Sequence, residues 1–157
     1  MKNTEIKAVA IEKSKEIIEN IMQILSIPQK RDVTMDFTYR KFDDVDQCVL
    51  DINMVGSPSE KHIRLDIDSE HSIILYEQLL QELLDTFLGH ETITISSFYL
   101  IQSMSENFSG IYLFIPNASK IRINLDASGE EFMNLISKYN QRYNEYMEQQ
   151  NNQKHAM

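Results

Sequence analysis

The spacing of apolar residues switches between a period of three to four and a period of two, and this switch constrains the fold more than any other feature of the chain. Over residues 4–26, apolar positions recur at three- and four-residue steps with Lys and Glu between them, which predicts an amphipathic helix. Pro28 ends this helix, because proline disfavours helical geometry in the residue before it. From Val33 to Tyr39 the period is two, as in a strand with one buried face. The chain is therefore expected to open with a helix followed by a strand.

Further runs along the chain follow one of these two periods. The strand-like runs lie at residues 48–54, 62–67, 91–101, 111–116 and 120–126, and the helix-like runs lie at residues 70–88 and 128–150. We therefore expect the order α-βββ-α-βββ-α in a single α+β domain, residues 1–150, followed by a frayed polar tail, residues 151–157.

The turns between consecutive strands are short, and strands joined in this way pair as antiparallel hairpins. We therefore expect an antiparallel sheet with the helices packed mainly on one face, because such a sheet can leave its other face polar. Offsetting the chain by 58 residues superposes IRLDID at residues 63–68 on IRINLD at residues 121–126. This match suggests an internal duplication of a βββα unit, although any strand that leads into a capped helix would give a similar pattern.

Residues 66–71, DIDSEH, concentrate three acidic side chains and a histidine, which raises the question of a metal site. The spacing partly matches a calcium-binding loop, but His71 stands where such a loop needs glycine, and the flanking elements are a strand and a helix. We predict instead that Asp68 or Ser69 caps the following helix, and that Arg64 pairs with the aspartates beside it.

The composition bounds the classes of function. The chain of 157 residues carries a formal net charge of −9, which argues against nucleic acid and anionic membranes as partners, since both require basic surface. No run approaches the roughly 20 apolar residues of a membrane span, and the first residues lack the apolar core of a signal peptide, so we expect a cytoplasmic protein. No phosphate-binding, nucleophile-elbow or Cys-x-x-Cys motif occurs, and the histidines lack metal-ligand spacing. We therefore expect no enzyme, no metal and no cofactor.

The fourth and fifth predicted strands are apolar on both faces, and a stripe of Tyr and Met continues along the last helix. Large exposed apolar patches on soluble proteins are typical of interaction sites, so either a terminal helix or another chain should cover the second face. Tyr and Met are also enriched at protein interfaces. The candidate partner-binding residues are Phe98, Leu100, Tyr112, Phe114, Tyr143, Tyr146 and Met147.

The order of the elements, the small size and the acidity are similar to class I effector chaperones of type III secretion. This resemblance implies a homodimer that wraps an extended client segment around apolar grooves. The usage of Lys, Asn and Ile equally fits a small immunity or inhibitor protein of a bacterium or phage. We therefore expect a non-catalytic protein-binding module, homodimeric, that covers a partner protein through an apolar sheet face and the last helix.

The sequence leaves two alternatives open. In the first, the chain is a small-molecule-binding regulatory domain, and the aromatic residues line a pocket between sheet and helices. In the second, it is an acidic mimic of nucleic acid. The mimic requires one ridge to carry six aspartates, namely Asp43, Asp44, Asp46, Asp51, Asp66 and Asp68.

Overall fold

The computed structural model describes residues 3–26, 32–54, 60–88, 97–103, 108–114, 121–125 and 130–155. Three α-helices and six strands follow one another in this part of the chain, and a single-turn 3-10 helix that the sequence did not predict precedes the second α-helix. The elements are α1 (Asn3–Leu25), β1 (Val33–Phe42), β2 (Val45–Met54), β3 (Glu60–Arg64), η1 (Ser69–His71), α2 (Ser72–Phe87), β4 (Ser97–Ser103), β5 (Phe108–Phe114), β6 (Ile121–Leu125) and α3 (Glu130–His155). The predicted α+β class is confirmed.

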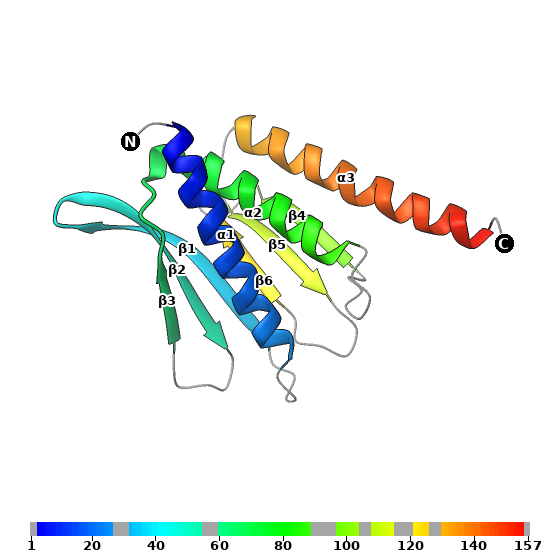
Figure 1. Ribbon diagram of the computed structural model, residues 1–157, viewed down its shortest axis with the longest axis horizontal. Helices are drawn as coiled ribbons and strands as arrows, with labels where there is room; N and C mark the ends of the chain where they lie inside the picture. The colour runs from blue at the N-terminus through cyan, green and yellow to red at the C-terminus, as the bar shows by residue number, and fades with distance from the viewer. Residues whose placement is uncertain are drawn as a thin grey trace.

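All six strands belong to one sheet with the order β3-β2-β1-β6-β5-β4 (Figure 1). Neighbouring strands pair antiparallel except at the centre, where β1 and β6 pair parallel, with Val33 opposite Ile121. The prediction of a purely antiparallel sheet is therefore wrong. The reason is that short turns dictate the pairing of consecutive strands only, whereas β1 and β6 are far apart in the sequence.

The parallel pair arises because the two halves of the chain run in the same direction. Each half forms a three-stranded meander followed by a helix, and the two meanders lie side by side in the sheet. Helices α2 and α3 also run in the same direction, since Glu77 pairs with Lys138 and Asp85 pairs with Arg142. This is the arrangement of a tandem βββα repeat; that the repeat arose by duplication stays a prediction.

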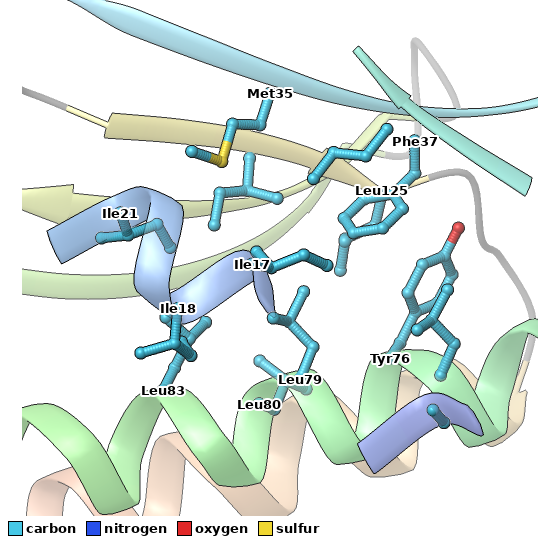
Figure 2. Close-up of a cluster of buried hydrophobic side chains, with 14 of the residues drawn as sticks. Ile17, Ile18, Ile21, Met35, Phe37, Tyr76, Leu79, Leu80, Leu83 and Leu125 are labelled. Carbon is cyan, nitrogen blue, oxygen red and sulfur yellow. The ribbon is translucent and has the colours of Figure 1, made fainter. Parts of the chain in front are cut away.

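All three helices contribute to one hydrophobic core on a single face of the sheet. Figure 1 shows α2 lying between α1 and α3, and Figure 2 shows α1 and α2 packed beneath the strands. Alternate residues of β1, β2 and β6 point into this core, which includes Val33, Met35 and Phe37 of β1. Since burying one such side chain stabilises the fold by roughly 1.5–3 kcal/mol, this core is the main source of stability.

Tyr76 of α2 connects three elements of the core. Its side chain is fully buried and meets the ring of Phe37 edge-on, with the centroids 5.4 Å apart, and the ring of Phe132 at 6.3 Å. Its hydroxyl lies 3.2 Å from the hydroxyl of Tyr39. Edge-to-face pairs add about 0.5–1.5 kcal/mol beyond the area they bury, so Tyr76 links β1, α2 and α3 with directional contacts.

The last helix is longer than the sequence indicated. Helix α3 continues to His155, so residues 151–155 are helical rather than part of a frayed tail. Neither glycine nor proline interrupts the polar end of the helix, and a helix that has been nucleated elongates at little cost.

The β1–β2 hairpin generates a first prediction, because its two turn residues, Asp43 and Asp44, have φ of 51° and 65°. A two-residue turn of this kind favours glycine, since a Cβ atom crowds the left-handed conformation. We expect Asp44→Gly to raise the free energy of unfolding by about 1 kcal/mol, and Asp44→Ala to lower it. Both variants remove the same charge, so the difference between their free energies of unfolding in urea reports the backbone conformation at residue 44. Equal free energies of unfolding would show that this conformation is not strained.

Tyr39 generates a second prediction. Burial raises the pKa of its phenol above the ordinary value of 10.0, Cys48 adds to the rise, and the hydrogen bond with Tyr76 opposes it. Above pH 10 the unfolded chain therefore releases this proton before the folded chain does, and stability falls as the pH rises. Tyr39→Phe should remove this contribution, which amounts to at most about 1.4 kcal/mol per pH unit. Urea unfolding of both proteins at several alkaline pH values measures this contribution. If the free energy of unfolding falls equally with pH in the wild type and in Tyr39→Phe, the prediction is refuted.

Candidate functional site

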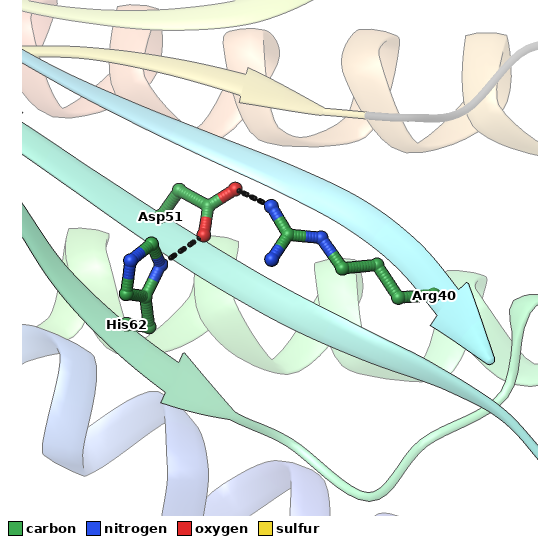
Figure 3. Close-up of polar contacts among 3 residues, drawn as sticks. All are labelled: Arg40, Asp51 and His62. Atoms are coloured by element: carbon green, nitrogen blue, oxygen red, sulfur yellow. Dashed lines mark hydrogen bonds and ion pairs between the residues drawn. The ribbon is translucent and has the colours of Figure 1, made fainter. Parts of the chain in front are cut away.

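The face of the sheet opposite the helices is here called the open face. In β1 the core residues alternate with Thr34, Asp36, Thr38 and Arg40, which therefore lie on the open face. Figure 3 shows this face with the helices behind the sheet. No helix of the described part of the chain covers it.

One half of the open face, formed by β6, β1, β2 and β3, carries a polar row. The strand registers align Asn124, Asp36, Asp51 and His62 across these four strands. Asp36 and Asp51 face each other directly, an arrangement that destabilises a strand pair unless donors compensate both carboxylates. Each carboxylate has its own donors, since Asn124 bonds Asp36 and His62 pairs with Asp51, as does Arg40 at 2.8 Å (Figure 3).

The other arginines of this half are also engaged. Arg64 bonds Gln47 and pairs with Asp66 at 3.3 Å, and the Nε of Arg122 donates to Asn124 at 2.9 Å. The pairing of Arg64 with Asp66 confirms that part of the sequence prediction. The contact between Arg64 and Gln47 links β3 to β2, whereas the other two contacts each join residues two positions apart in the chain. The arginines of the polar half are thus engaged by neighbouring side chains of the same chain.

The other half of the open face belongs to β4 and β5, and the registers assign its residues. Residues directly opposite each other in a sheet share a face, and Tyr112 lies opposite Arg122 of the open face. Tyr99 lies opposite Tyr112 and therefore shares its face. Ile101 lies opposite Gly110, which in turn lies opposite Asn124 of the open face. Alternation adds the remaining positions. We define the aromatic patch as the register positions Tyr99, Ile101, Phe108, Tyr112 and Phe114.

The predicted grouping of Phe98 and Leu100 with Tyr112 and Phe114 is therefore wrong. Phe98 lies opposite Leu113 and Leu100 lies opposite Ile111, positions that belong to the face with the helices. Local alternation does not fix the register between two strands, and a slip of one residue exchanges the faces. Tyr99 and Ile101 were missed for this reason. Phe108 was missed because the predicted strand began only at residue 111, whereas β5 begins at Phe108.

The candidate residues of the last helix divide between core and surface. Tyr143 is only 8% exposed and belongs to the hydrophobic core, so it is not available on the surface of this chain. Met147 is partly buried against the same core, and Tyr146 is also partly buried. The stripe points inward because α3 packs against α2 and β4. Tyr146 and Met147 remain candidates at the margin of the core.

The acidic junction at residues 66–71 is a strand-to-helix connection. The Asp68 side chain accepts a hydrogen bond from the backbone amide of His71 at 3.1 Å and lies 2.6 Å from Nδ1 of the same residue. The predicted capping role of Asp68 is confirmed, although the helix it caps directly is η1. Ligand atoms of Asp68, Glu70 and His71 lie within 4.8 Å of one another and could hold a divalent cation, but the cap already engages Asp68.

The six aspartates required of a nucleic-acid mimic do not share one ridge. Asp46 and Asp51 are an odd number of residues apart in β2 and so lie on opposite faces. Asp46 accepts a hydrogen bond from Ser69 at 2.8 Å, and Asp51 is paired with Arg40 and His62. The charges are thus dispersed and partly neutralised.

Comparison of this chain with protein-family models, curated proteins and solved structures finds no match. None of the helices among the described residues is both long and apolar enough to cross a membrane.

The assignment of faces generates a third prediction, from two adjacent residues of β4. Leu100 belongs to the helix face and Ile101 to the open face. We expect Leu100→Asp to destabilise the protein by several kcal/mol or to unfold it, because the substitution places a carboxylate against the core. Ile101→Asp should lower the free energy of unfolding much less than Leu100→Asp does, because position 101 belongs to the open face. Circular dichroism and urea unfolding test both variants, and the reverse order would overturn the assignment.

Proposed function

We propose that this protein is a non-catalytic protein-binding module that receives a partner protein on the aromatic patch of its open face. The observation that carries the proposal is the register, which assigns Tyr99, Ile101, Phe108, Tyr112 and Phe114 to the face that no described helix covers. Aromatic side chains bury about 150–250 Å² each, so the four in the patch can supply the roughly 800 Å² that one side of a stable interface requires.

The neighbouring polar half suits the margin of such an interface. Arg40 and Arg64 are paired with Asp51 and Asp66, and Asp36 accepts a hydrogen bond from Asn124. These charged groups already have partners within the chain, so contact with another protein need not leave them unpaired. An apolar centre with a polar margin is the usual anatomy of a protein interface. Secretion chaperones and immunity or inhibitor proteins both act by covering a partner's surface, and the open face is suited to either role.

The register weighs against the small-molecule alternative. A pocket between sheet and helices would need its aromatic lining on the helix face, whereas Tyr112 and Phe114 belong to the open face. Tyr76, Leu79 and Leu83 on the helix side are fully buried in the packed core. The protein-binding hypothesis therefore agrees better with the register positions of the aromatic residues than the small-molecule hypothesis does.

Affinity capture from cells of the native host tests the proposal. We expect the paired substitutions Tyr112→Asp and Phe114→Asp, both in β5, to weaken retention of the partner protein at least about tenfold, as expected when central aromatic contacts are lost. Asn53→Asp is the matched control, because Asn53 is an exposed residue on the polar half of the same face. Quantitative mass spectrometry compares the retained proteins, with folding checked by circular dichroism. If the double variant retains the same proteins as the wild type, the patch is not the binding site.

A further inference from the structure

The two edges of the sheet differ in charge. Strand β3 forms one edge and carries Glu60, Lys61, His62 and Arg64, and Lys61 also bonds Asn20 of α1 at 2.5 Å. Strand β4 forms the other edge, and its sequence SFYLIQS contains no charged residue and no proline. Charged residues and proline are the devices by which edge strands avoid pairing with other chains. The β3 edge has such protection and the β4 edge lacks it.

The surroundings of β4 in the sequence are also almost free of charge. A quarter of the whole chain is charged, at 25%, yet residues 92–119 contain one charged side chain, Glu106. Two copies of a chain with a net charge of −9 repel each other over roughly a Debye length, about 8–10 Å, wherever their acidic surfaces meet. The end of the sheet formed by β4 and β5 is where a second copy would meet the least repulsion.

Helix α3 extends the same edge on the helix face. It contacts β4, and its 26 residues span about 39 Å, whereas the 7 residues of β4 span roughly 23 Å. Figure 1 shows the C-terminal end of α3 projecting past the sheet. The partly buried side chains of Tyr146 and Met147 lie on this second half of the helix. A chain that docks along β4 would therefore have helical surface beside the strand.

We propose that β4 pairs antiparallel with β4 of a second copy across a two-fold axis, joining the two sheets into one continuous sheet. Antiparallel self-pairing is the only closed way in which two identical edges can meet, because a two-fold interface is self-complementary. With Leu100 on the axis, positions 99 and 101 face each other, and the two aromatic patches become neighbours on one enlarged open face. The proposal rests on the proposed function in that it names a second copy as the first partner at this end of the sheet.

Light scattering coupled to size-exclusion chromatography, over a wide range of concentration, tests the pairing on the full chain. We expect the wild type to show twice the chain mass of 18.4 kDa. Ile101→Lys places a charge on the edge strand and should halve the measured mass while the circular dichroism spectrum stays unchanged. Ser97→Lys with Ser103→Lys is a second edge variant that removes no apolar side chain, and we expect the same halving.

Two matched controls separate the edge from the face. His62→Lys changes the opposite edge, and Tyr112→Lys changes the open face one strand away from the edge. Both should retain the dimer. A monomeric wild type, a dimer that persists in both folded edge variants, or a dimer lost equally in Tyr112→Lys would overturn the proposal. If the wild type is monomeric but the patch substitutions still weaken retention of the partner protein, the pairing of β4 is refuted and the proposed function stands. If the wild type is dimeric but the patch substitutions leave the retained proteins unchanged, the proposed function is refuted and the pairing of β4 stands.

Discussion

The burial of α2 is the constraint on which the rest of the structure depends. Seven of its 16 residues are buried, so the helix needs apolar cover on its flanks as well as from the sheet. Helices α1 and α3 pack against the two flanks of α2, and the strands cover the side of α2 that faces the sheet. All three described helices therefore lie on one face of the sheet, and none of them covers the opposite face. The open face is thus a consequence of how much apolar surface α2 has to bury.

The local elements could be predicted from the sequence because their determinants are local. The period of apolar residues identifies helices and strands, and a short polar side chain before a helix identifies a cap such as Asp68. The parallel pairing of β1 with β6 could not be predicted in this way. It depends on which edges remain free after each meander has formed, and no pattern within either strand encodes that choice.

The candidate site was only partly predictable for the same physical reason. Apolar residues at alternate positions indicate two faces, but the register between β4 and β5 decides which residues share one. The register therefore assigns Phe98 and Leu100 to the helix face of the sheet, and it assigns Tyr99 and Ile101 to the same face as Tyr112. Tyr143 shows a related limit, because a stripe of tyrosines on a helix is equally suited to a core and to an interface.

The tandem arrangement explains why β4 is the edge at which a further strand is expected. In the first half of the chain, the strand equivalent to β4 is β1, and its outer edge is occupied by β6. The same edge of the second half is β4, which no described strand covers. Parallel continuation would require β3 of another copy and would build an open filament. The charged residues of β3 oppose that contact, whereas the uncharged β4 can pair with itself and close the assembly at two copies.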